Sequence, residues 1–389
     1  MTGARDSQPL PTTRARQPVA CVLGTRPELI KMAPVVHALA AHSGLEPLLV
    51  NTGQHRELLA PTLELFALEP AVSLELMRPG QRLAGFFGRC VEALDLALDE
   101  LRPAAIVAQG DTSTVLAAAL VAFYQRVPFF HVEAGLRTRD WNNPWPEEMN
   151  RALASRFAAL HFAPTSAARE NLVAEGIAAE TIQITGNTVI DALLMVRAMR
   201  IPHGVALTPG RRLIVVTSHR RESFGTPMRS TMRALRTIAR RWPDVEIVYP
   251  AHPNPEVRRA IDEVIGDEPS IRIVEPLAYG PFVSLLDAAT LVLTDSGGIQ
   301  EEAPALGKPV LVLRDETERP EAIEANVARL VGTDEERVVG EVGRLLDDPE
   351  WFRGMARGAS PYGDGHAAGR IVRAIERYLE AAPHPRHAR

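Results

Sequence analysis

Four ionisable side chains stand where they could move a proton to and from carbon. Asp111 and His219 each come shortly after an apolar run of strand length. Glu133 ends a third such run, and Glu147 stands where a Pro-Trp-Pro segment meets a helix start. Removing a proton beside an electron-poor centre needs a base, and returning it to the other face needs an acid on the opposite wall. Together these residue types fit proton abstraction and return at a carbon atom.

Each of these side chains also has a structural interpretation. Asp111 could cap the helix that follows it, and Glu133 could form a buried ion pair with Arg137. Glu147 could favour a helix N-terminus through its charge alone. His219 could bond the neighbouring backbone. The residues taken singly leave both interpretations open. The position of Asp111, Glu133 and His219 at predicted strand ends, and of Glu147 on a rigid loop, favours chemistry.

The segment 294–310 carries the clearest signal for a ligand. An apolar run leads into a polar, Gly-rich turn and then into a helix that we expect to begin near Gly298. The first N–H groups of a helix have no internal partner, and the helix dipole attracts negative charge. Gly297 lets a phosphate approach the backbone, Ser296 offers a hydroxyl, and Glu302 could accept bonds from two ribose hydroxyls. The pattern predicts a nucleoside diphosphate, against the alternative of an ordinary strand-to-helix turn. The cations that could balance the charges are Arg26, Lys31, Arg137 and Arg319.

The elements that must position these residues are short apolar strands that alternate with helical patterns. Continuous apolar runs are typical of parallel strands buried on both faces. Two successive series predict an α/β fold of two doubly wound, Rossmann-like domains that face each other across a cleft. The predicted strands are 19–24, 47–51, 105–109, 129–132, 160–163 and 182–185, then 213–217, 246–249, 271–274, 291–294, 310–313 and 329–331.

Domain boundaries follow from the same pattern. We expect a disordered tail over residues 1–17, a first domain over 18–195 and a second over 196–366. A Pro- and Gly-containing linker is expected at 195–212. A final helix, about 367–381 within the segment 367–389, should pack back across the domains.

Composition narrows the function classes. The chain has 389 residues, is 46% hydrophobic and carries a net charge of −5, which is normal for a soluble globular protein. This charge implies no broad nucleic-acid-binding or membrane-binding surface. No apolar run approaches a membrane span of roughly 18 residues, and the N-terminus lacks a signal core. With two cysteines, Cys21 and Cys90, we expect no structural zinc site and a cytoplasmic location.

The motifs, taken together, resemble one family: the bacterial non-hydrolysing UDP-N-acetylglucosamine 2-epimerases. The resemblance covers about residues 18 to 380. The stretches that carry it are 24–28 (GTRPE), 54–57 (QHRE), 109–112 (QGDT), 131–138 (HVEAGLRT), 144–148 (PWPEE), 185–188 (TGNT), 218–222 (SHRRE), 249–254 (YPAHPN), 294–304 (TDSGGIQEEAP) and 317–321 (TERPE).

The resemblance implies a GT-B-like architecture, shared with one class of nucleotide-sugar glycosyltransferases. It implies interconversion of UDP-N-acetylglucosamine and UDP-N-acetylmannosamine, with no NAD, metal or other cofactor, by a homodimer. The implied route is loss of the C2 proton with anti-elimination of UDP, which leaves a 2-acetamidoglucal in the cleft. UDP then adds back, and the proton returns on the opposite face.

Site residues follow from the matching motifs. Asp111 and Glu147 are expected to handle the C2 proton, while Glu133 and His219 position the sugar and the charge at the diphosphate. Lys31 is expected beside the carboxylates, where an ammonium could tune their pKa values. The residues that the resemblance places around UDP are Arg26, Ser296, Gly297, Gly298, Glu302 and Arg319, with Phe282 near the uracil.

The resemblance also suggests regulation and leaves alternatives. Some members are activated by a second UDP-N-acetylglucosamine, and Gln54, Glu57 and His252 would lie near such a site. A 2-epimerase of a related acetamido or diacetamido UDP-sugar differs by little in sequence. A UDP-sugar glycosyltransferase would need an acceptor groove, and a non-catalytic nucleotide-sugar-binding regulator would not need the four catalytic candidates.

Overall fold

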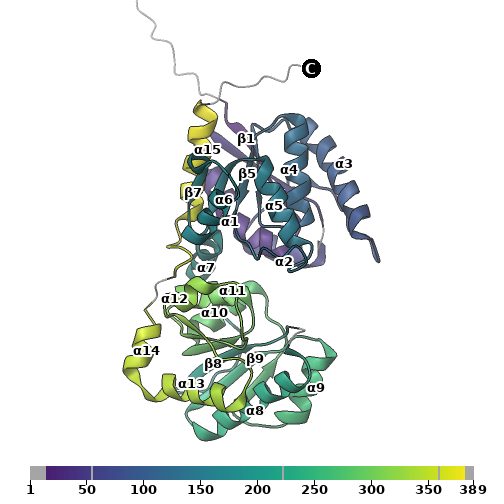
Figure 1. The fold of residues 1–389 in the computed structure, drawn as a ribbon. Coiled ribbons are helices and arrows are strands. Elements are labelled where there is room, and N and C mark those ends of the chain that lie inside the picture. Colours follow the sequence, from purple (N-terminus) through teal and green to yellow (C-terminus); the bar gives the residue numbers. More distant parts are fainter. Residues whose placement is uncertain (1–14, 54–55, 221–222, 358–359, 382–389) are drawn as a thin grey trace, which may run out of the picture.

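The structure is a computed structural model and describes residues 15–53, 56–220, 223–357 and 360–381. It contains two parallel sheets, each flanked by helices, in two domains that lie one above the other in Figure 1. The predicted α/β class with two doubly wound domains is confirmed. No helix in these ranges is long and apolar enough to cross a membrane.

The first domain is built on a seven-stranded sheet with the order β3-β2-β1-β4-β5-β6-β7. Its strands are β1 (Gln17–Leu23), β2 (Leu45–Asn51), β3 (Val72–Ser73), β4 (Ala105–Gln109), β5 (Phe129–Val132), β6 (Ala158–Ala163) and β7 (Ile182–Ile184). Its helices are α1 (Arg26–Ala41), α2 (Arg56–Leu65), α3 (Leu83–Leu101), α4 (Ser113–Gln125), α5 (Glu147–Phe157), α6 (Ser166–Ala174) and α7 (Thr188–Ala198), with a 3-10 turn at Ala179–Thr181.

The second domain is built on a six-stranded sheet with the order β10-β9-β8-β11-β12-β13. Its strands are β8 (Arg212–Thr217), β9 (Val245–Pro250), β10 (Ile271–Val274), β11 (Leu291–Thr294), β12 (Val310–Val312) and β13 (Ala328–Leu330). Its helices are α8 (Thr226–Arg241), α9 (Pro255–Val264), α10 (Tyr279–Ala288), α11 (Gly297–Ala305), α12 (Pro320–Glu324), α13 (Glu335–Asp347) and α14 (Pro349–Met355).

The apolar strands are buried because helices cover both faces of each sheet. Every residue of β4 is buried, and alternate side chains of β1 and β4 enter two separate apolar clusters on opposite faces. Strand pairs in both sheets run parallel, so their carboxyl ends meet at one edge. Loops from those edges carry the polar motifs, which is where ligands bind in sheets of this kind.

Helix α7 joins the two domains through a shared apolar core. Val189, Leu193 and Val196 pack in one buried cluster with Ile30 of α1 and with Val283 and other residues of domain two. The predicted linker was wrong at its start, because α7 continues to Ala198 before the chain reaches β8. A helix whose buried face contacts both domains gives no polar signal at its end.

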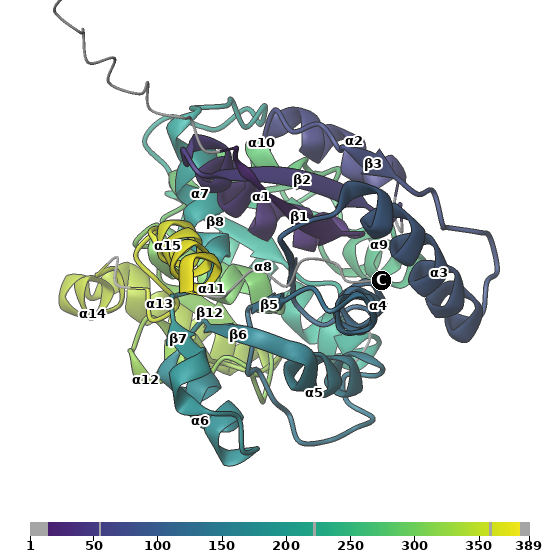
Figure 2. The same ribbon diagram turned by 90° about the horizontal axis from the view of Figure 1, so that it is seen from above.

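Two further boundary predictions need correction. The last residues of the segment 1–17, expected as a disordered tail, are ordered, because β1 begins at Gln17 and the Arg16 guanidinium donates to the carbonyl of Leu45. Helix α15 has the predicted bounds, Ala367–Ala381, but it packs on α1 and α7 and on domain one's apolar cluster (Figure 2). The segment before it makes the crossing, with Tyr362 buried in the shared core.

Candidate active site

A cavity of about 500 Å³ opens between the two domains, and most of the predicted carboxylates line it. Domain one supplies Asp111, Glu133 and Glu147 from the loops after β4 and β5 and from the start of α5. Arg26 and Lys31 of α1 also face it, and Arg319 closes it from domain two. The predicted convergence on one cleft therefore brings three of the four catalytic candidates together.

Asp111 is held by one cation and one amide from α5 rather than acting as a cap. Thr112 is the N-cap of α4, since its side chain accepts from the Val115 N–H, so the capping interpretation of Asp111 is wrong. The Arg151 guanidinium lies 2.8 Å from the Asp111 carboxylate, and Asn150 donates to the Asp111 carbonyl. Burial raises the pKa of Asp111, with Arg151 opposing that shift. A carboxyl group whose pKa is raised in a cleft is a candidate for proton exchange with a ligand.

Glu133, in contrast to Asp111, lies among several donors that stabilise its ionised form. Its carboxylate accepts from the Lys31 ammonium at 2.6 and 2.8 Å, from the Asn187 amide at 2.8 Å and from Gln109. Burial alone would raise the pKa of Glu133, but Lys31 and the other donors outweigh it and the pKa is lowered. The residue has a positive φ of 61°, which costs energy for a side chain of this size and is common at functional sites.

Arg137 does not pair with Glu133, so that structural interpretation was wrong. Its guanidinium forms two bonds with Glu175 of the segment after α6, and its side chain is only 3% exposed. Arg137 is not among the residues that line the cavity. Its position therefore favours a structural role in domain one over the substrate contact that the sequence predicted.

Glu147 is the first residue of α5 and faces the cavity, half-buried. The neighbouring Glu148 points away from it and accepts from the backbone N–H groups of Thr138 and Arg139. The two adjacent carboxylates therefore have different roles. Glu148 fixes the loop against the helix, while Glu147 stays available to a ligand.

His219 follows β8 on the wall formed by domain two, but it does not line the cavity that holds the carboxylates. Its side chain is 44% exposed, with Nδ1 3.6 Å from the buried Asp295 carboxylate. Asp295 also accepts from the backbone N–H groups of His219 and Arg220. Asp295 therefore orders the loop from beneath, and the imidazole is partly exposed outside the cavity.

The N-terminus of α11 has the features of an anion site. Ser296 is its N-cap, and within the described part of the chain no side-chain cap bond takes up the first N–H groups. A Cβ added at Gly297 would lie 3.8 Å from the Arg319 guanidinium and 3.9 Å from that of Arg220. Gly298 is exposed, with open space where a side chain would stand. Two guanidinium groups thus approach a helix terminus that already attracts negative charge.

Glu302 lies further along α11 and is buried. Its carboxylate accepts from the Tyr279 hydroxyl at 2.7 Å, and burial raises its pKa to about 7. Tyr279 lines a second, more apolar cavity of about 550 Å³ between α2 and the start of α10, and Arg26 lines both cavities. Phe282 is only partly buried on α10 and packs against the shared core. Of the described residues, Arg26 is the one that the linings of the two cavities share, the first of them lined mostly by polar side chains and the second more apolar.

The expected regulatory residues are only partly described. Gln54 lies outside the described residues, and so does the side chain of Glu57. His252 is exposed and stacks on His219, with ring centroids 5.7 Å apart. Activation by a second nucleotide sugar stays a prediction.

A family model described as UDP-N-acetylglucosamine 2-epimerase matches residues 37–376, which is most of the chain. The chain belongs to this epimerase family. A curated UDP-N-acetylglucosamine 2-epimerase of Escherichia coli K12 is 49% identical over 371 residues, covering 92% of this chain and 98% of that protein.

Solved structures of epimerases have the same fold. A putative UDP-N-acetylglucosamine 2-epimerase from Listeria monocytogenes is 43% identical with a TM-score of 0.88, covering 95% of this chain and 99% of that one. The enzyme from Neisseria meningitidis, solved bound to UDP-GlcNAc, is 39% identical with a TM-score of 0.84, covering 92% and 100%.

Three site residues of this epimerase-family chain were not predicted: Arg151, Asn187 and Glu301. Arg151 stands one helical turn after Glu147 on α5, a spacing that puts both on one face. Asn187 and Glu301 lie inside motifs that the sequence resemblance had already marked. Their partners come from other elements, so nothing local identified them. Among the described residues, no group of three or more His, Cys, Asp or Glu side chains could hold a metal ion.

Proposed function

We propose that this chain is a UDP-N-acetylglucosamine 2-epimerase that interconverts UDP-N-acetylglucosamine and UDP-N-acetylmannosamine. The observation that carries the proposal is that one cavity holds two carboxyl groups whose pKa values are shifted in opposite directions. Burial raises the pKa of Asp111, whereas that of Glu133 is lowered beside Lys31. Family membership, at 49% identity to the Escherichia coli enzyme, supports the same activity.

The nucleotide would bind along the two cavities. The diphosphate would lie against the N-terminus of α11, with Ser296, Gly297, Gly298, Arg26 and Arg319 around it. Glu302 would accept the ribose hydroxyls, and the uracil would enter the more apolar cavity near Tyr279 and Phe282. In this orientation the sugar would lie in the cavity with the carboxylates, since Arg26 lines both cavities.

The reaction would then proceed by elimination and re-addition. One carboxylate removes the C2 proton as the C1–oxygen bond breaks, so a C1–C2 double bond forms and UDP leaves with the electron pair. UDP adds back to C1, and a carboxyl group returns a proton to C2 on the other face. Asp111 and Glu147 are the two groups that we assign to these transfers, because both face the cavity from different elements.

Glu133, Lys31 and His219 would act on charge and position. Lys31 holds Glu133 ionised, so Glu133 fits a fixed anion better than a proton carrier. The ammonium stands near the leaving diphosphate in this arrangement. His219 would approach the diphosphate from domain two. It starts from an exposed position, so its role requires the loop after β8 to move toward the cavity.

Two other activities make different demands on the site. A glycosyltransferase needs an acceptor, and a 2-epimerase of a diacetamido sugar needs room for one more group. The enzyme should be incubated with UDP-N-acetylglucosamine alone, without acceptor, NAD or metal, and the nucleotide sugars separated by chromatography. We expect UDP-N-acetylmannosamine to accumulate. Turnover only with an added acceptor would establish a transferase, and turnover only with a diacetamido substrate would correct the sugar.

The second copy in a homodimer would cover an apolar face of domain one. Exposed Leu96 of α3, Phe123 and Tyr124 of α4 and Leu153 of α5 lie on neighbouring helices, with the rings of Phe123 and Phe157 5.6 Å apart. Large exposed apolar patches mark interaction sites. Light scattering of the wild type should give twice the mass of one chain. The Phe123→Glu variant should give the mass of a single chain. A wild-type monomer would contradict the proposal.

A cytoplasmic location is part of the same proposal. Both cysteines are buried free thiols in the described structure, which suits a reducing compartment. Fractionation of the native host should recover the protein with other cytoplasmic enzymes. Recovery with an exported fraction would contradict this assignment.

A further inference from the structure

One buried amide links the two domains behind the active-site cavity. Asn187, at the N-cap of α7, donates one Nδ2 hydrogen to Glu133 at 2.8 Å and the other to Glu301 of α11 at 2.6 Å. Its Oδ1 accepts from the Val189 N–H, and the side chain is buried. Both amide hydrogens are therefore used, and they serve carboxylates that belong to facing domains.

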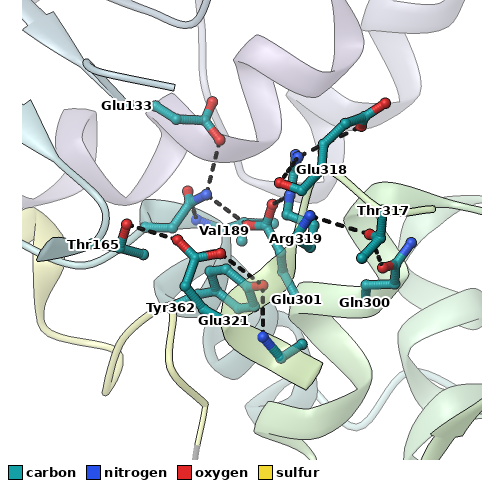
Figure 3. A network of polar contacts seen from close by, with 12 residues as sticks. Glu133, Thr165, Val189, Gln300, Glu301, Thr317, Glu318, Arg319, Glu321 and Tyr362 are labelled. Atoms are coloured by element: carbon teal, nitrogen blue, oxygen red, sulfur yellow. Dashed lines mark hydrogen bonds and ion pairs between the residues drawn. The ribbon is translucent and has the colours of Figure 1, made fainter. Parts of the chain in front are cut away.

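Each of these carboxylates is in turn held by a cation that faces the cavity. Glu133 pairs with Lys31 of α1, and Glu301 pairs with Arg319, as Figure 3 shows for the latter two. These groups form a row across the domain boundary. A cation and a carboxylate stand on each side, and the neutral amide of Asn187 lies between the two carboxylates. Lys31, Glu133 and Arg319 line the cavity, whereas Asn187 and Glu301 do not. The amide and Glu301 thus support from behind the groups that would meet a ligand.

The chemistry of the amide suits this position better than other side chains do. Two carboxylates at this separation repel each other unless a donor stands between them. An aspartate there would add a third negative charge, and an apolar side chain would take one hydrogen bond from each carboxylate. The positive φ of Glu133 also needs firm support from its neighbours.

The backbone of Asn187 is fixed to domain two as well. Its N–H donates to the Tyr362 carbonyl at 2.6 Å, and the Tyr362 hydroxyl accepts from the Ala322 N–H of α12, the helix that Arg319 precedes. Gly186 has a φ of 84°, and a Cβ there would come within 3.1 Å of Gly363. The close approach of these two glycines sets the place of Asn187 between the domains.

We propose that Asn187 is a positioning residue for the epimerisation. Through Glu133 and Glu301 it sets the spacing of Lys31 and Arg319, which would hold the leaving diphosphate from opposite domains. This inference rests on the proposed function. Because Asn187 supports these groups without reaching the substrate, its loss should lower kcat more than it changes KM.

The test compares Asn187→Asp with the wild type. Asp has the same shape and keeps the acceptor that caps α7, so only the two donors are lost and a charge is gained. We expect kcat to fall about 100-fold, the effect of misplacing a reacting group by about 1 Å. KM should stay within about threefold of the wild type, and calorimetric titration with UDP should still give one site per chain.

Two further variants complete the design. Asn187→Ser removes both amide N–H donors without adding charge, and its shorter hydroxyl keeps a capping oxygen, so it replaces Asn187→Asp if that variant fails to fold. Asp334→Asn replaces a carboxylate by an amide at the N-cap of α13. This position lies outside the row from Lys31 to Arg319, so kcat should be unchanged. A kcat for the Asn187 variants near the wild-type value, or a loss matched by fewer UDP sites, would overturn the inference. Absence of epimerisation by the wild type itself would overturn the proposed function, and the inference with it.

Discussion

At the scale of single residues, sequence patterns identified the carboxylates but not their partners. Asp111, Glu133 and Glu147 could be predicted because each follows a strand or begins a helix, which places it at the cleft. The pairings of Asp111 with Arg151 and of Glu133 with Lys31 join residues far apart in the chain or on different elements. Those pairings depend on how helices pack onto the sheet, which local patterns do not encode.

Asp111→Asn should lower kcat by about 10²- to 10⁴-fold, the usual contribution of a general acid or base. The amide cannot take up the C2 proton, while its shape preserves the fold. Steady-state kinetics with UDP-N-acetylglucosamine gives kcat, and UDP titration gives the fraction of intact sites. Glu170→Gln, which changes an exposed carboxylate on α6, serves as the control and should retain full activity. Full activity of Asp111→Asn would remove Asp111 from the mechanism.

The environment of Glu302 makes UDP binding depend on pH. Burial raises the pKa of Glu302 to about 7, so the free protein loses the ionised acceptor as the pH falls below that value. The Kd for UDP should therefore rise about tenfold from pH 8 to pH 6. UDP itself also titrates in this range, so Glu302→Gln is the matched control. This variant should bind weakly with a shallower pH dependence, and equal slopes for both proteins would contradict the role of Glu302.

The raised pKa of Glu302 also affects folding stability. Lower pH weakens UDP binding through this group, but it favours the folded state. Because its pKa is higher in the folded chain than the ordinary value of 4.5, the folded state binds more protons between about pH 4.5 and 7. Its contribution to the free energy of unfolding therefore falls as the pH rises through this window. Thermal unfolding of wild type and Glu302→Gln at both ends of the window should show the difference.

At the scale of elements, continuous apolar runs predicted the strands well. The bounds of β4, β5, β10 and β11 match the predicted runs, and β4, β5 and β11 are buried along their whole length. The two-residue strand β3 was not predicted, because an edge strand that is half-exposed has no apolar run to mark it. The end of α7 was also missed, since its last residues are apolar on the face that joins both domains.

Helix α11 offers a direct test of the anion site. Gly298→Val fills open space beside the helix N-terminus, so the fold should tolerate it. The added side chain should obstruct a diphosphate and weaken UDP binding by about tenfold or more, roughly the loss of one charge-assisted contact. Gly340→Val, at an exposed position of α13 that also has open space, is the control and should bind normally. Normal UDP affinity of Gly298→Val would place the diphosphate elsewhere.

At the scale of the whole molecule, the two sheets share a core as well as a cleft. The cluster around α7 includes side chains from both domains, and α15 packs back on domain one. The sequence indicated two domains because its strands form two series. It gave no sign that one apolar cluster spans them, because the residues of that cluster come from distant segments.

The shared core predicts that the domains unfold together. Leu193 of α7 is fully buried in it, and Leu193→Ala should lower the free energy of unfolding by about 2–5 kcal/mol. Calorimetry should show a single transition that moves as a whole. Leu172→Ala changes a buried residue of domain one alone and should also shift that single transition. Two transitions, with only one of them shifted, would show that the domains unfold independently.

Reversible proton transfer at C2 is the central claim, and proton NMR in deuterated water measures it directly. Purified protein should be incubated with UDP-N-acetylglucosamine without metal or NAD. We expect the anomeric signal of UDP-N-acetylmannosamine to grow, with deuterium at C2 of the product. A manno product that keeps its original C2 proton, or release of UDP with no manno product, would contradict the account.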